Sequence, residues 1–234
     1  MSAAFETARA PEKDRPDQAV EAAESTAAPA HAKAKQSAGD VQAFFVDGGR
    51  TRAKKANNPK SGDELTFTDI DATGKASIKK AMAHAKTKVA SAITQIAGAK
   101  TAKQAKAARY FKIDGTGSDE KKAVDKVLEV FGKIQTALNG KLEFEGEKPD
   151  GNTQAYVYTG FVGLFDGAIH IHFPNFNNYD LDEQAAIIIH ELSHKYAGTD
   201  DNAYLYETGK WNKMSMKDAC NNADSYCYYA VNAS

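Results

Sequence analysis

Residues 180–194 have the sequence DLDEQAAIIIHELSH, and this stretch decides the fold. Asp180 stands where the cap of a helix is expected, and Glu183, three residues later, can complete a capping box. The apolar run 187–189 predicts that this helix is buried. The helix therefore carries residues 190–194, HELSH, into the interior of the protein.

Two histidines on this helix, His190 and His194, are four residues apart, so both imidazoles project from one face and can bind one metal ion. Imidazole suits zinc, and catalytic zinc sites combine three protein ligands with an open position for water. Zinc lowers the pKa of this water toward about 7, and Glu191 can take its proton as the water attacks a peptide carbonyl. The alternative is a coincidental pair of histidines on a core helix. The capped, apolar helix and the candidate third ligands after it favour one catalytic zinc ion.

The third ligand is sought in residues 198–204, GTDDNAY, which follow the histidines closely. HExxH followed by a GTxD segment and a tyrosine three residues later resembles the aspzincins, the family of deuterolysin and the peptidyl-Lys metalloendopeptidases. The resemblance implies that Asp201 is the third zinc ligand and that Tyr204 hydrogen-bonds the oxyanion of the tetrahedral intermediate. Asp200 is the alternative ligand, because the spacing after His194 is shorter than in familiar members.

This resemblance implies a zinc-dependent endopeptidase that hydrolyses internal peptide bonds of a protein or peptide substrate. It also implies an α+β zincin fold, in which helices pack on a small, mostly antiparallel sheet and the active-site helix forms the floor of a cleft. The resemblance extends over about residues 76–230 and includes the segment 222–226, NADSY, which is similar to the family's C-terminal helix.

In the lysine-specific members, acidic residues on that C-terminal helix belong to the pocket for the residue after the scissile bond. Asp224 matches one such position, so the resemblance implies a substrate-binding residue that favours Lys. A hydrogen bond from Asp224 to a neighbouring loop is the equally weighted alternative. Cys227 stands where a second carboxylate would strengthen attraction for lysine, which makes a strict preference for Lys less secure.

The chain divides into three parts by composition. Residues 1–40 are rich in Ala, Glu, Lys and Pro and are predicted to be a disordered tail, and 41–75 are predicted to be a linker or a pro- or docking segment. Residues 76–234 are expected to form the metallopeptidase domain. Its predicted helices begin at Ser77, at Ser118 and at Ser215, the last running toward Ala230.

Short strands are predicted around residues 142–144, 155–158 and 169–173. His170 and His172 alternate on the last of these, so both face the same side of the sheet. We expect them to lie outside the metal site. The strand that carries them is expected to pair with the substrate backbone.

Residues 72–113 contain many lysines and no acidic residue, although the whole chain has a formal net charge of -1. A basic helix can bind nucleic acid or an acidic partner, so the alternative function is a binding module with a structural or vestigial zinc site. Lysines on the solvated face of a helix are the simpler interpretation. We therefore expect no nucleic-acid partner, and a monomer.

The sequence has no apolar run long enough to cross a membrane and no classical secretory signal. Cys220 and Cys227 would lie roughly 10 Å apart on one helix, which is too far for a disulfide. These features therefore do not specify the cellular compartment of the protein. Three locations are compatible with the sequence: an extracellular one, a target reached by a route without a signal peptide, as for a secreted bacterial effector, and the cytoplasm.

Overall fold

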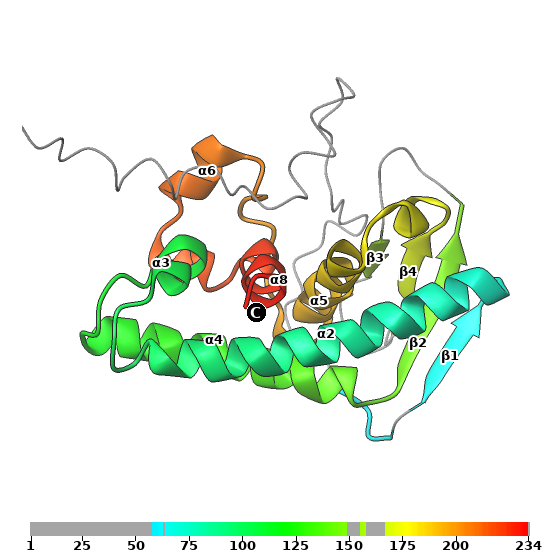
Figure 1. Cartoon of the computed structure of the whole chain (residues 1–234), viewed down its shortest axis with the longest axis horizontal. Coiled ribbons are helices and arrows are strands. Elements are labelled where there is room, and N and C mark those ends of the chain that lie inside the picture. The colour runs from blue at the N-terminus through cyan, green and yellow to red at the C-terminus, as the bar shows by residue number, and fades with distance from the viewer. Residues whose placement is uncertain (1–57, 63, 149–154, 158–166, 234) are drawn as a thin grey trace, which may run out of the picture. The chain divides into compact units, whose positions relative to one another are not determined.

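The computed structural model describes residues 58–62, 64–148, 155–157 and 167–233. They form an α+β structure in which helices pack on a small sheet, which confirms the expected fold class (Figure 1). The helices are α2 (Ala72–Gly98), α3 (Ala105–Phe111), α4 (Ser118–Leu138), α5 (Leu181–Ala197), α6 (Thr208–Lys213), α7 (Met216–Ala219) and α8 (Ala223–Val231). The predicted tail, residues 1–40, lies outside the described residues.

The sheet consists of β1 (Leu65–Thr68), β2 (Leu142–Glu147), β3 (Ala155–Val157) and β4 (Ile169–His172), in the spatial order β1-β2-β4-β3. The pairs β1–β2 and β2–β4 are parallel, and β3 runs antiparallel to β4. The expectation of a mostly antiparallel sheet is therefore wrong. Helices α2 to α4 connect β1 to β2, and a crossover of that length permits a parallel pair.

Strand β4 lies in the interior of the sheet, with β2 on one side and β3 on the other. Among the described residues, Ile169 to Ile171 of β4 are paired on both edges, with β2 and with β3, so these residues have no free edge for a substrate. The prediction that the strand with His170 and His172 pairs with the substrate is therefore wrong. In the part of the sheet that the structure describes, the edge position next to β4 belongs to β3.

Residues 65–68, which fall in the segment 41–75, form the other edge strand of the sheet, and Phe67 stacks on Phe144 of β2 with 5.9 Å between ring centroids. Packed structure thus begins before residue 76. Helix α2 also begins earlier than the predicted Ser77. Asp71 caps it, and its side chain accepts a hydrogen bond from the Gly74 backbone N–H at 2.7 Å.

The predicted positions of α4 agree with the structure, except that Gly117 rather than Ser118 occupies the cap position. Helix α5 is the centre of the described structure, because it contacts α2, α4, α8 and β3 (Figure 1). Every side chain from Glu183 to Tyr196 is buried, as the apolar run predicts. Asp180 accepts a hydrogen bond from the Glu183 backbone N–H at 2.9 Å, so the predicted cap is present.

The predicted single C-terminal helix is divided into α7 and α8, so this expectation is wrong. Ser215 does cap α7, where its hydroxyl accepts from the Asp218 backbone N–H at 3.1 Å. The chain leaves helical structure at Cys220–Asn222 because the Ala223 backbone N–H donates instead to the carbonyl of Asp200, at 3.0 Å. The interruption thus connects this region to the loop that follows α5.

Several lysines of the basic stretch are bound within the protein. Lys88 donates to the carbonyl of Val231 at 3.0 Å and pairs with Asp182 at 3.2 Å, and Lys103 pairs with Asp114 at 2.7 Å. This use of charge favours the interpretation of a solvated helix face over a binding surface. Among the described residues, no helix is both long and apolar enough to cross a membrane.

Candidate metal centre

Three side chains meet at the C-terminal half of α5. His190 Nε2 and His194 Nε2 are 3.0 Å apart, and Asp201 Oδ1 lies 3.2 Å from the first and 3.3 Å from the second. Both imidazoles are buried, and the Asp201 side chain is 17% exposed. The structure therefore brings together all three residues that the sequence nominates as metal ligands.

Hydrogen bonds on the opposite side of each imidazole orient these nitrogens. His194 Nδ1 lies 2.7 Å from the carbonyl oxygen of Thr199, and His190 Nδ1 lies 3.0 Å from Asp224 Oδ1. A carbonyl oxygen only accepts, so the His194 proton is on Nδ1 and its Nε2 presents a lone pair. Such partners fix the tautomer and the ring orientation of histidines that bind metals.

This donor set fits zinc. A tetrahedral ion with bonds of about 2.0–2.2 Å separates its ligand atoms by about 3.3–3.6 Å, close to the separations found here. Asp201 Oδ1 is buried and has no hydrogen-bond partner among the described residues. Without a metal, burial raises the pKa of the Asp201 carboxyl, but the imidazoles of His190 and His194, when protonated, outweigh burial and hold this pKa far below its usual value. A metal ion would replace those protons on the imidazoles. An ionised oxygen facing two imidazole nitrogens is a ready ligand for a cation.

The loop after α5 is shaped by its own sequence. Gly198 ends the helix in the left-handed region, at φ 68°, which glycine adopts without strain. Thr199 then binds His194 through its carbonyl, while its hydroxyl lies 2.7 Å from that of Ser193. Gly198 and Thr199 thus reverse the chain after α5, so that Asp201 lies beside the two histidines. Sequence reasoning did not identify Thr199, although its place in the GTxD segment was a usable signal.

The same loop is also held by contacts with Asn222, which lies between α7 and α8. Asp200 forms a parallel bridge with Asn222, and the buried Asn222 side chain binds both the N–H and the C=O of Ala203, at 3.0 and 2.9 Å. Asp201 and Tyr204 therefore sit in a segment that is clamped at both ends. This role of Asn222 was also missed, because it depends on a contact between distant parts of the chain.

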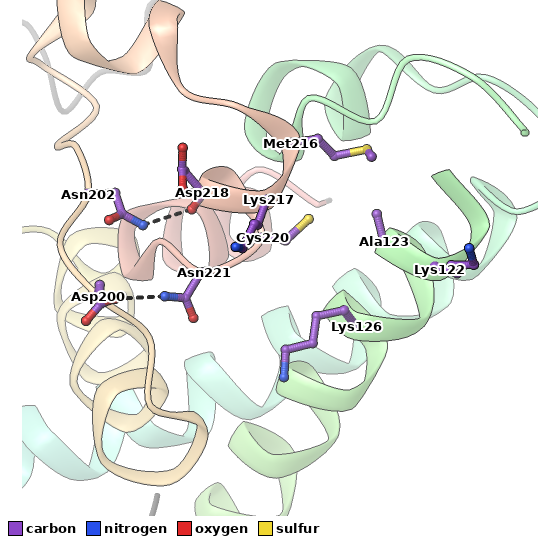
Figure 2. Close-up of a pocket in the computed structure, with 10 residues that line it drawn as sticks. All are labelled: Lys122, Ala123, Lys126, Asp200, Asn202, Met216, Lys217, Asp218, Cys220 and Asn221. Carbon is purple, nitrogen blue, oxygen red and sulfur yellow. Dashed lines mark hydrogen bonds between the residues drawn. The ribbon is translucent and has the colours of Figure 1, made fainter. Parts of the chain in front are cut away.

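The alternative ligand, Asp200, points elsewhere. Its Oδ2 accepts from Asn221 Nδ2 at 2.9 Å, and both side chains line a separate cavity of about 670 Å³, bounded by α4, α7 and residues 200–202 (Figure 2). None of the three clustered ligands lines this cavity. The geometry therefore favours Asp201 over Asp200.

Glu191 lies between the two histidines in sequence, and Tyr204 follows Asp201 by three residues. Glu191 is 2% exposed and follows His190 directly on α5. Tyr204 is half-buried, and its ring stacks on that of Tyr206 with 5.5 Å between centroids. Burial, followed by the nearby Asp201 carboxylate, raises the pKa of the Tyr204 phenol, so this hydroxyl stays protonated and able to donate at neutral pH.

Asp224 is 1% exposed, and both of its oxygens are bonded within the protein. Oδ1 faces His190, and Oδ2 accepts from the Leu205 backbone N–H at 2.8 Å. This placement favours the structural alternative that the sequence left open over direct contact with a substrate. Asp224 links the first imidazole to the loop that carries Asp201.

Cys220 and Cys227 are both buried and free, and they belong to different segments, the end of α7 and the middle of α8. Burial raises the pKa of the Cys227 thiol to about 12, so this group is neutral where a carboxylate would be charged.

Comparisons with known proteins support the same interpretation. A sequence model of the aspzincin family, described as lysine-specific metallo-endopeptidase, matches residues 96–231, more than half of the chain. Among solved structures, a zinc peptidase from Grifola frondosa is similar in fold, with a TM-score of 0.58 and 22% identity over 70% of this chain and 97% of that one. A search of curated proteins found no match. The chain belongs to the aspzincin family of zinc metallo-endopeptidases.

Proposed function

We propose that this chain cleaves internal peptide bonds at the centre formed by His190, His194 and Asp201. Glu191 acts there as the general base, and Tyr204 stabilises the oxyanion. The convergence of the three ligand atoms within 3.3 Å of one another carries the proposal. Bound zinc supplies Lewis acidity and lowers the pKa of water at the site.

Two side chains, Glu191 and Tyr204, transfer the proton of the water and stabilise the negative charge on the carbonyl oxygen. Glu191 accepts a proton from the attacking water and returns it to the leaving amine, and its burial strengthens this exchange by excluding bulk water. Tyr204 keeps its proton, so its hydroxyl can donate a hydrogen bond to the carbonyl oxygen as negative charge develops there.

The substrate backbone is proposed to pair with β3. Among the described strands, β3 lies at the edge of the sheet, and it contacts α5, which carries His190 and His194. An extended peptide added to this edge would therefore run beside the metal centre. The pairing is assigned to β3 because β4 is enclosed by its two neighbours.

A preference for Lys after the scissile bond is the finer part of the proposal. It is supported by the description of the matching family, lysine-specific metallo-endopeptidase. The thiol of Cys227 is neutral, and the carboxylate of Asp224 faces His190. Little negative charge therefore remains to attract a lysine ammonium. We therefore propose a weaker preference than two carboxylates would produce.

The test compares the native chain with Glu191→Gln on a diverse peptide pool, with cleavage sites mapped by mass spectrometry. Glu191→Gln is expected to keep its zinc and to lose cleavage by about 10²- to 10⁴-fold. Glu183→Gln makes the same change on the same helix, two turns away, and is expected to cleave like the native chain. Undiminished cleavage by Glu191→Gln would remove Glu191 from the mechanism.

The same pool tests the substrate preference through Asp224→Asn. If Asp224 acts only through His190, all cleavage sites slow by a similar factor and the preference is unchanged. Selective loss of cleavage before Lys would show instead that Asp224 contacts the substrate.

A further inference from the structure

A second group of metal-binding side chains lies on the sheet, and we call it the sheet-face cluster: Glu145, Glu147, Tyr156, His170 and His172. In the strand register, Glu145 is opposite His170, Glu147 is opposite His172, and Tyr156 is opposite His170 from the other side. Successive residues of a strand alternate between faces, so all five side chains share one face. The apolar residues between them, such as Phe144 and Ile171, are buried on the other face.

The cluster contains three ligand atoms in close proximity. His170 Nδ1 lies 3.0 Å from Glu147 Oε1 and 3.8 Å from Glu145 Oε2. The Tyr156 hydroxyl donates to Glu147 Oε1 at 3.2 Å, and its ring stacks on His170 with 4.5 Å between centroids. One histidine and two carboxylates thus lie within 4.8 Å of one another, as the ligands of one ion would.

His172 supplies an independent observation. It is 4% exposed, and its Nδ1 lies 2.7 Å from the carbonyl oxygen of Lys148, which can only accept. The proton is therefore on Nδ1, and Nε2 presents a lone pair. That atom is buried and has no hydrogen-bond partner among the described residues, which is the condition found for Asp201 Oδ1 at the catalytic ligands. A buried lone pair without a partner is costly unless a cation or donor meets it.

We propose that the sheet-face cluster binds a second divalent metal ion of the zinc class. Glu145, Glu147 and His170 are its ligands, and His172 lies beside them on the same face of the sheet. Imidazole with carboxylates suits zinc better than calcium or magnesium, which prefer oxygen ligands. The two carboxylates also balance the charge of a divalent cation.

The ligands come from β2 and β4, and Tyr156 of β3 is bonded to one of them, so the ion would hold three strands together. One of these is the edge strand beside α5. The proposed role is to stabilise the sheet, and it does not depend on which residues carry out peptide cleavage.

The first test is zinc content of the full chain after equilibration with buffered zinc chloride. The native chain is expected to bind two ions, and Glu145→Gln/Glu147→Gln and His190→Ala/His194→Ala one ion each. Glu143→Gln is the matched control, because Glu143 is an exposed carboxylate on the same face of β2 outside the cluster, and it should keep two ions. A single ion in the native chain, or equal loss in Glu143→Gln, overturns the proposal.

Thermal unfolding gives a second measurement that does not involve catalysis. In His190→Ala/His194→Ala, zinc at a hundredfold excess over its Kd is expected to raise the Tm by about 5 to 10 °C. Adding Glu145→Gln/Glu147→Gln should abolish this rise. The absence of any zinc-dependent rise in the histidine variant would contradict a second site.

Discussion

At the scale of single residues, Asp200 and Asp201 are adjacent in sequence but lie in different surroundings. Asp201 faces the two imidazoles, whereas Asp200 is bonded to Asn221 beside a separate cavity. Spacing alone could not separate them, because a loop has no periodicity to indicate which side chain turns inward. The proximity of His190 and His194, by contrast, was predictable, because the period of a helix places residues four apart on one face.

This difference makes the third ligand testable. Asp201→Ala is expected to lower the zinc content by one ion per chain and to abolish cleavage, because two imidazoles alone hold zinc weakly. Asp200→Ala removes a carboxylate one position earlier and is expected to keep both zinc and activity. Zinc content is measured after dialysis against a weak chelator. Loss of the ion from Asp200→Ala alone would reassign the ligand.

Tyr204 is the other residue with a proposed role in catalysis. Tyr204→Phe removes a donor that acts only when the oxyanion forms, so kcat is expected to fall by about 10²- to 10³-fold with little change in KM. Tyr206→Phe removes the hydroxyl of the ring stacked on it and should have a small effect. Equal effects of the two variants on kcat would argue against a role specific to Tyr204.

At the scale of elements, the positions of helices and strands were more predictable than the directions of strands. Alternation of polar and apolar residues has the same period in parallel and antiparallel strands, so the sequence of β2 and β4 contains no signal for their parallel pairing. The interruption between α7 and α8 was missed for a related reason. The chain leaves its helix to bind Asp200, about twenty residues away, and local propensity does not report such a contact.

Asn222 lies in this interruption between α7 and α8, and we expect its side chain to stabilise the metal centre. Asn222→Ala leaves the N–H and the C=O of the buried Ala203 without their partners, at a cost of about 2 to 4 kcal/mol of unfolding free energy. Zinc affinity should fall as well, because the loop with Asp201 loses its clamp. Urea unfolding of the zinc-free chain and chelator competition measure the two effects.

Asn202→Ala is the control for this prediction, since Asn202 is in the same loop but its bond to the carbonyl of Asp218 is exposed. It is expected to change both quantities little. If Asn222→Ala and the native chain unfold at the same urea concentration, the hydrogen bonds between Asn222 and Ala203 do not contribute to stability.

At the scale of the whole molecule, the extent of the folded unit differs from what composition suggests. Large apolar residues are sparse in segment 41–75, and for this reason the sequence suggested a linker or a pro- or docking segment there. Yet Ile70 is 6% exposed, and the partly buried Leu65 and Phe67 pack against the core. A short edge strand contributes few residues, so composition averaged over a window conceals it.

Two truncations test where the folded unit begins. A chain starting at residue 58 keeps β1 and the cap of α2, whereas a chain starting at residue 76 loses both. Burial of Ile70 contributes about 1.5–3 kcal/mol and the Asp71 cap about 1 kcal/mol, before the partly buried side chains are counted. The shorter chain is therefore expected to melt at least about 6 °C below the longer one in calorimetry.

The chain starting at residue 58 should also match the full chain in zinc content and in cleavage rate, because all the ligands and their hydrogen-bond partners lie beyond that point. A faster rate after removal of residues 1–57 would identify them as an inhibitory pro-segment. Equal melting temperatures for the two truncated chains would place the start of the folded unit at residue 76 after all. In that case β1 would be an accessory strand, and the metal centre would rest on the helices and the three remaining strands alone.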